Sequence, residues 1–225
     1  MSISLATILD LISRECPAIT IESRSVFPET ILNDAEVQFA LTMRPLRRAQ
    51  FAAGRACARA ALSRVGSVPY AIPCDPDGVP QWPTGFVGSI SHKSTESIAA
   101  VAFAREFRGI GIDLECDKAA DEEVLSGVVV NRAEVDQLVQ LRRETAEIGS
   151  PSTWLFSAKE AVYKAVFPLF RIPLSWEDVE IAFVPGKRTF VPTIRDHQDL
   201  SLRGRIIGNG AWIVAISWLE PPRCT

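Results

Sequence analysis

The chain has 225 residues, of which 47% are hydrophobic and 23% charged, and its formal net charge is −3 at pH 7. This composition is typical of folded globular proteins and excludes a disordered or fibrous chain. Because the charge is slightly acidic, we expect no nucleic-acid partner, and any anionic ligand must meet local basic groups.

The cysteines and the apolar runs indicate the compartment in which the protein acts. Five widely spaced cysteines contain no Cys-x-x-Cys pair, which argues against a disulfide framework and a zinc site. The N-terminal stretch has no basic region ahead of an apolar core, and no apolar run reaches the length that spans a bilayer. We therefore expect a cytoplasmic protein without a leader or a membrane contact.

The first half of the chain reads as helix followed by sheet. Helix formers dominate residues 34–65, where Pro45 predicts a break or a new start, and residues 46–62 predict a helix with an arginine-bearing side. Four prolines and two glycines predict a loop over residues 73–85. Three short β-like runs follow and predict a small sheet, at residues 86–91, 97–104 and 109–115.

The second half reads as helices followed by sheet. Asn131 and Glu134 form a capping-box pattern for a helix to about Arg143, and Ser150 with Pro151 begins a helix that should end near Pro168. Four strand-like runs come next, at residues 179–183, 189–194, 201–207 and 211–218. This order predicts an α+β fold of two similar halves, residues 1–107 and 108–225, each a small, mostly antiparallel sheet packed with helices.

Two carboxylates end the strand predicted at residues 109–115. Asp113 and Glu115 are two positions apart, so a β-strand points both to the same face, where they can grip one hard cation. A strand that simply ends in polar residues at the surface would show the same pattern.

An acid and a base share one face of the helix predicted after Pro151. Glu160 and Lys164 are four residues apart, a spacing that suits a reacting pair and equally suits an exposed ion pair worth about 0.3–0.5 kcal/mol.

Phosphate-binding chemistry is suggested at two further places. The segment Gly-Ser-Ile-Ser-His at residues 88–92 ends in Ser91 and His92, which fit an anion contact better than a metal site because no second histidine or cysteine is near in sequence. The arginines of the predicted helix at residues 46–62 suit phosphate oxygens, although a solvated basic helix face is as ordinary a reading.

Taken together, these motifs resemble the 4'-phosphopantetheinyl transferases. They are Arg47-Arg48 with Arg55-x-Cys-Ala-Arg59, Gly-Ser-Ile-Ser-His at 88–92, Gly-Ile-Asp-Leu-Glu at 111–115, and Phe-Ser-Ala-Lys-Glu-Ala-Val-Tyr-Lys at 156–164. They occur in the family's order over residues 44–170. Within the family the chain is similar to the monomeric branch with two related halves, of the enterobactin-synthase type, which serves siderophore and other secondary-metabolite synthases.

The resemblance implies a set of site residues. Magnesium or manganese would be held by Asp113, Glu115 and Glu160, and the catalytic residues would be Glu160 and Lys164. Coenzyme A would be bound by six side chains: Arg47, Arg55, Ser91, His92, Lys159 and Lys164. Glu160 would remove the acceptor's proton, directly or through a metal-bound water.

The resemblance also implies an activity. The 4'-phosphopantetheine arm of coenzyme A would pass to a serine of an acyl or peptidyl carrier domain of a nonribosomal peptide, polyketide or fatty-acid synthase, releasing 3',5'-adenosine bisphosphate. The sequence departs from the family pattern at Gln50 and at Val79, where relatives often carry a glutamate and a basic residue, so part of the nucleotide contact is unassigned.

Three interpretations stay open at this point. The apolar residues Val124, Leu125, Val128, Val129 and Val130 would either receive the carrier's helix or belong to the core. A module that binds coenzyme A or a nucleotide without turnover, and a magnesium-dependent phosphohydrolase, would use similar residues.

Overall fold

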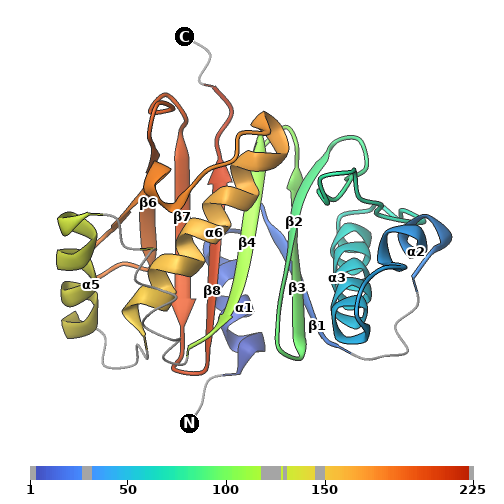
Figure 1. Ribbon diagram of the computed structural model, residues 1–225, viewed down its shortest axis with the longest axis horizontal. Helices are drawn as coiled ribbons and strands as arrows, with labels where there is room; N and C mark the ends of the chain where they lie inside the picture. Colours follow the sequence, from blue (N-terminus) through green and yellow to red (C-terminus); the bar gives the residue numbers. More distant parts are fainter. Residues whose placement is uncertain (1–3, 27–31, 118–127, 129–130, 145–149, 223–225) are drawn as a thin grey trace.

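The computed structural model describes residues 4–26, 32–117, 128, 131–144 and 150–222. Within these ranges the strands form two antiparallel sheets that stand next to each other, with helices on both faces (Figure 1). This is the α+β architecture with antiparallel sheets that the sequence predicts.

The first sheet and its helices come from the N-terminal part of the chain. Helix α1 (Leu5–Glu15) and strand β1 (Thr20–Ser25) precede helices α2 (Asp34–Ala40) and α3 (Pro45–Arg64). Strands β2 (Phe86–Lys93) and β3 (Glu96–Phe103) complete a sheet of order β1-β3-β2. Helix α3 begins with Pro45 in its first turn, as predicted, and packs Cys57, Ala61 and Leu62 against Ala99 and Val101 of β3.

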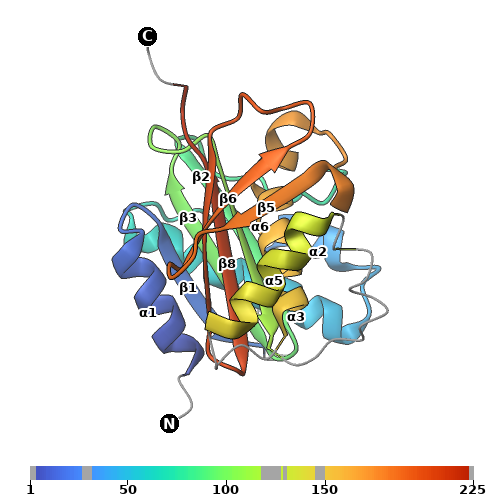
Figure 2. The ribbon, with the colours of Figure 1, turned by 90° about the vertical axis from the view of Figure 1, so that its left-hand side faces the viewer.

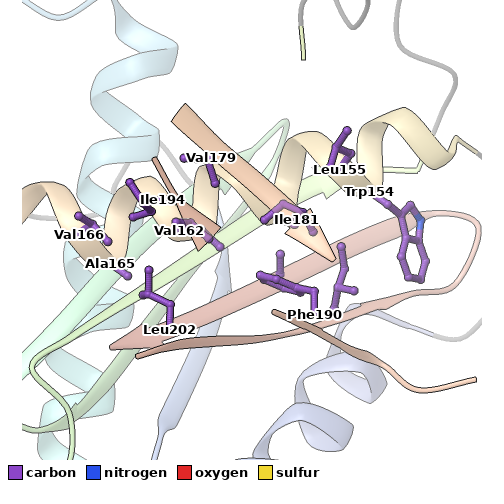
Figure 3. Packing of buried hydrophobic residues seen from close by; sticks show 14 of the residues in the cluster. Trp154, Leu155, Val162, Ala165, Val166, Val179, Ile181, Phe190, Ile194 and Leu202 are labelled. Carbon is purple, nitrogen blue, oxygen red and sulfur yellow. The ribbon is translucent and has the colours of Figure 1, made fainter. Parts of the chain in front are cut away.

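The second sheet has the order β4-β8-β7-β6-β5 and is crossed by the longest helix of the C-terminal part. Its strands are β4 (Gly109–Cys116), β5 (Val179–Phe183), β6 (Thr189–Ile194), β7 (Leu202–Gly208) and β8 (Trp212–Leu219). Helices α5 (Arg132–Glu144) and α6 (Pro151–Phe170) precede β5, with the short 3₁₀ helix η1 (Trp176–Asp178) between. Figure 3 shows Leu155, Val162 and Val166 of α6 facing Ile181, Phe190 and Leu202 of the sheet.

The two sheets meet where β2 and β4 lie side by side (Figure 1). These strands belong to separate sheets, and serine side chains of β2 bind the backbone of β4 instead. The Ser89 hydroxyl accepts the Ile112 amide at 3.0 Å, and the Ser91 hydroxyl accepts the Leu114 amide at 3.2 Å. Because Ser89 and Ser91 are two residues apart, both hydroxyls point toward β4.

Helix α1 covers the face of the sheets opposite α6 (Figure 2). Its Ile8 and Ile12 share one apolar cluster with Ile98 of β3, Ile112 of β4 and Ile216 of β8. This apolar cluster therefore spans both predicted halves, and the division between residues 107 and 108 stays a prediction.

The predicted strands and helices are confirmed to within about two residues. Helix α6 ends at Phe170, two residues after Pro168, because a proline in the last turn removes only one backbone donor there. Helix α1 and strand β1 were not predicted, although Leu5, Ile8, Leu9 and Ile12 have helical spacing and are all buried.

The apolar run considered for carrier docking lies mostly outside the described residues. This applies to Val124, Leu125, Val129 and Val130. Val128 is described, and its side chain belongs to the core around α6 with 1% of its surface exposed, so it is not available to a partner.

Across the part of the chain that the structure describes, no helix combines the length and the apolar composition needed to cross a membrane.

Candidate active site at the joint of the two sheets

A pocket of about 470 Å³ opens where β2, β4 and α6 meet, and α3 and the loop after it complete its wall. Eight of the predicted site residues line it: Arg47, Arg55, Ser91, His92, Asp113, Glu115, Glu160 and Lys164. Residues from both halves of the sequence therefore form one site.

Close contact between β4 and α6 brings the two chemical motifs together. A Cβ atom on Gly111 would lie 1.9 Å from the carbonyl oxygen of Ala161, and one on Gly109 would lie 2.3 Å from that of Ala165. Only glycines allow this approach, since the obstacle is helix backbone that no rotamer change can move. The glycines beside the carboxylate pair thus set the distance between Asp113 and the face of α6 that carries Lys164.

Asp113 is the centre of the polar network. Its side chain is almost fully buried, and Oδ1 accepts hydrogen bonds from Lys164 Nζ at 2.6 Å and from the Ser91 hydroxyl at 3.1 Å. Oδ2 accepts a hydrogen bond from the Ser157 hydroxyl at 2.9 Å. Lys164 Nζ also donates to Ser91 Oγ at 3.1 Å, so helix and both strands are joined at one carboxylate.

The two glutamates are held differently. Glu115 forms an ion pair with Lys93 Nζ at 2.5 Å, yet burial and the nearby charge of Asp113 keep its carboxyl pKa above the ordinary value. Burial also raises the pKa of Glu160, and Asp113 and Glu115 add to this effect while Lys164 opposes it. For both glutamates burial is the main cause of the raised pKa, and the neighbouring carboxylates add to it.

The donor set suits a magnesium ion, because carboxylate oxygens are the ligands that this hard cation prefers. In the described residues, however, no group of three or more His, Cys, Asp and Glu side chains is arranged as a metal-binding cluster. Two of the carboxylates instead hold lysines: Asp113 holds Lys164 and Glu115 holds Lys93. The carboxylate oxygens therefore suit magnesium chemically. In this structure the positive charge next to Asp113 and Glu115 comes from the ammonium groups of Lys164 and Lys93.

The other wall of the pocket is basic. Arg47 donates through Nη1 to His92 Nε2 at 2.5 Å, which requires the imidazole to be unprotonated at that nitrogen. Burial lowers the pKa of His92 to about 4, and the charges of Arg47 and Lys164 act in the same direction. His92 is therefore neutral at pH 7.

Arg55 lies deeper in the same wall. Its Nε donates to the Ile72 carbonyl at 2.8 Å and its Nη2 to Cys74 Sγ at 2.6 Å. The neighbouring Arg59 instead pairs with the buried Glu36 at 2.6 Å and supports α2. Not every arginine of the predicted basic helix face thus serves the pocket.

Comparison with known proteins matches both parts of the chain to one family. Residues 35–102 match the model of the 4'-phosphopantetheinyl transferase N-terminal domain, and residues 109–217 match that of the 4'-phosphopantetheinyl transferase superfamily. The chain belongs to this superfamily.

Relatives with this name cover much of the chain. The 4'-phosphopantetheinyl transferase Svp of Streptomyces mobaraensis is 33% identical over 202 residues, 86% of this chain and 81% of that protein. Npt of Nocardia iowensis is 39% identical over 61% of this chain and 60% of its own length, and PptT of Mycobacterium tuberculosis 36% over 61% and 59%. The crystal structure of a holo-[acyl-carrier-protein] synthase from Thermotoga maritima has a TM-score of 0.40 at 19% identity, covering 52% of this chain and 66% of that one.

Lys159 is the predicted coenzyme A contact that does not fit the geometry of this transferase. It is not among the residues that line the described pocket, and its side chain has no exposed surface. Nζ forms an ion pair with Glu134 at 3.0 Å and donates to the carbonyls of Val128 at 2.9 Å and Trp176 at 3.0 Å. Since neighbouring residues on a helix point about 100° apart, Lys159 faces the core while Glu160 faces the pocket.

Three further polar residues of the transferase site were not predicted. Ser157 binds Asp113, Ser89 joins β2 to β4, and Lys93 pairs with Glu115. Ser157 could have been found, because it lies three residues before Glu160 and seven before Lys164, on the same helical face.

Proposed function

We propose that this transferase moves the 4'-phosphopantetheine arm of coenzyme A to a serine of a carrier domain, with magnesium held by Asp113, Glu115 and Glu160. The observation that carries the proposal is that these three carboxylates and Lys164 line one pocket with Arg47 and its hydrogen-bond partner His92. Family membership supports the reaction, and the charge distribution of the pocket supports the division of roles.

The basic wall would bind the phosphates of coenzyme A. Arg47 and Arg55 are assigned to the 3'-phosphate, because an arginine presents several donors to phosphate oxygens. His92 and Ser91 are assigned to the phosphates nearer the reaction. The neutral His92 can donate one hydrogen bond through Nδ1, since Nε2 accepts from Arg47.

The acidic wall would hold the metal. Magnesium bound by Asp113, Glu115 and Glu160 would neutralise charge on the pyrophosphate during transfer. In this structure Asp113 and Glu115 form ion pairs with Lys164 and Lys93, so the metal would share these carboxylates with the ammonium groups or take their place.

The transfer step needs one base and one stabilised leaving group. The serine oxygen of the carrier attacks the phosphorus next to the pantetheine, and the bond from that phosphorus to the bridging oxygen breaks. The bridging oxygen leaves with its electron pair on 3',5'-adenosine bisphosphate, and Lys164 stabilises the charge that develops. The serine proton passes to Glu160, either directly or through a water molecule, because this carboxylate lines the same pocket as Lys164.

We further propose that the enzyme acts as a cytoplasmic monomer on acyl or peptidyl carrier domains. One chain supplies residues to every wall of the pocket, which supports the monomer. The four cysteines in the described ranges, Cys16, Cys57, Cys74 and Cys116, are free thiols, as suits a reducing compartment.

Intact mass measurement tests the proposal. The purified protein is mixed with coenzyme A, magnesium and an apo carrier domain, and the carrier should gain the mass of the phosphopantetheine arm. No gain with several different carriers would refute the assignment.

Two variants test the roles within the site. Glu160→Gln should abolish transfer while the protein stays folded, and Asp113→Ala should lower the rate and raise the magnesium concentration required. Glu177→Gln removes an exposed carboxylate outside the pocket and serves as the control with unchanged activity. Full activity in Glu160→Gln would remove that residue from the reaction.

A further inference from the structure

One rim of the pocket is closed by an ion-pair cluster that joins the two halves of the chain. Arg171 follows the last residue of α6, and its side chain reaches the loop between α3 and β2. Nη2 donates to Asp75 Oδ2 at 2.5 Å, and Nη1 donates to Asp77 Oδ2 at 2.9 Å. We call these three residues the Arg171 clasp. Asp77 itself lines the pocket, so the clasp lies at the pocket wall.

Asp75 connects the clasp to the whole loop. Its Oδ1 accepts the backbone amides of Asp77 at 3.0 Å and Val79 at 2.9 Å, which fixes the turn. A β-bridge between Cys74 and Pro80 closes the base of the turn. Since this turn is internally bonded, a tie to Asp75 holds the pocket wall formed by Cys74, Asp77, Gly78, Val79 and Pro80 as one piece.

The backbone of Arg171 has a left-handed conformation, which is unfavourable for a residue with a long side chain. It ends α6 with φ 55° and ψ 27°, the left-handed region in which glycine or asparagine is preferred. A larger side chain there costs free energy, of the order of 1 kcal/mol. The side chain that occupies this position makes both ion pairs of the clasp and lies over the Phe167 ring, 5.7 Å from its centroid.

Phe167 continues the connection into the pocket. Its ring stacks on Tyr163 with centroids 5.0 Å apart, and both residues line the pocket from α6. The Arg171 side chain is therefore bonded to the loop on one side and packed on the aromatic wall of the pocket on the other. Although burial acts to raise it, the hydrogen bond from Arg171 and that from the Val79 amide hold the pKa of Asp75 below its ordinary value.

We propose that Arg171 is a positioning residue, which holds the loop of Asp75 and Asp77 against α6 and thereby slows the release of coenzyme A from the pocket. The inference rests on the proposed function, since it assumes that coenzyme A is the ligand. Arg171 does not line the pocket, so its effect should appear in ligand retention and leave the transfer step unchanged.

Coenzyme A binding and transfer measured in parallel test the clasp. Arg171→Gln should raise the Kd, the KM and the dissociation rate for coenzyme A about three- to tenfold, with kcat at saturation unchanged. Its Tm should fall by less than about 4 °C, because exposed ion pairs contribute little to folding. Arg171→Lys, which keeps the charge but reaches one carboxylate at a time, should be intermediate. Arg195→Gln, at an exposed ion pair outside the pocket, should match the wild type in every measurement.

The double variant Arg171→Gln, Asp77→Asn distinguishes the loss of the ion pairs that hold the loop from a change in net charge at the pocket rim. It removes one positive and one negative charge, so the net charge at the rim equals that of the wild type. Continued weak binding supports the clasp, whereas full recovery would overturn it in favour of charge repulsion alone. An unchanged dissociation rate in Arg171→Gln, or a loss confined to kcat, would also overturn it. A wild-type protein that bound no coenzyme A would instead refute the proposed function.

Discussion

Replacing Lys159 by methionine should destabilise the fold without weakening coenzyme A binding. The lysine ammonium group is enclosed in the core, where it pairs with Glu134 and donates to the carbonyls of Val128 and Trp176. Burial lowers the pKa of Lys159, although Glu134 works in the other direction. Methionine has a similar length and fills the same space, so the change removes the charge and the donors while keeping most of the packing.

The expected loss follows from the burial of the pair. Both side chains have 0% exposed surface, so the variant removes the ion-pair partner of a carboxylate in the core. Breaking a buried ion pair on one side costs about 3–5 kcal/mol. For a domain of this size that corresponds to a decrease in Tm of roughly 6–20 °C. The double variant Lys159→Met, Glu134→Gln also removes the buried negative charge and should recover at least about 2 kcal/mol.

Thermal and urea unfolding followed by circular dichroism would measure the loss, and calorimetric titration below the Tm would measure coenzyme A affinity. Lys187→Met, at an exposed position, is the matched control and should change neither quantity. We expect the Kd of Lys159→Met to stay within about twofold of the wild type. An unchanged Tm together with a tenfold weaker Kd would refute the reasoning and restore Lys159 as a phosphate ligand.

Gly111→Ala should lower the free energy of unfolding by about 2 kcal/mol or more and reduce kcat, because its Cβ would lie 1.9 Å from the Ala161 carbonyl oxygen. Urea titration would measure the loss of stability. Gly54→Ala is the milder control, because its Cβ would meet only a side-chain methyl group. His92 has a folded pKa of about 4 and an unfolded value near 6.5, so stability should fall as pH drops from about 6.5 to 4, with unfolding taking up nearly one proton. His92→Asn should flatten that slope in unfolding curves measured across this pH range, and an unchanged slope would contradict it. Chelation of magnesium should stop transfer. Glu115→Gln should raise the magnesium concentration for half-maximal rate more than tenfold, since even mutation of residues that hydrogen-bond to metal ligands changes metal affinity 10- to 100-fold. An unchanged magnesium titration would exclude Glu115 as a ligand.

Much of the fold was predictable because its elements carry strong local signals. Pro45 and Pro151 mark the starts of α3 and α6, and the loop at residues 73–85 is dense in proline and glycine. Pro168 likewise marks the end of α6, which follows two residues later at Phe170. Packing of α6 along the second sheet supports this last turn despite one missing hydrogen bond.

The candidate site was predictable to the extent that its residues follow regular spacings. The pair Asp113 and Glu115 fits the period of a strand, and Glu160 with Lys164 fits the period of a helix. Each pair has an ordinary structural explanation when taken alone. Their joint occurrence in the family's order indicates a transferase, and the matches over residues 35–102 and 109–217 confirm the family.

The amino-acid pattern was enough to predict a strand that ends in carboxylates and a helix that carries an acid and a base. The folded chain was needed to show that Lys159 points to the core, that Ser91 joins the sheets, and that Arg171 reaches across to Asp75. This difference arises because spacing along a chain fixes the angle between two side chains on one element. The direction in which that element faces depends on packing with partners that are distant in sequence.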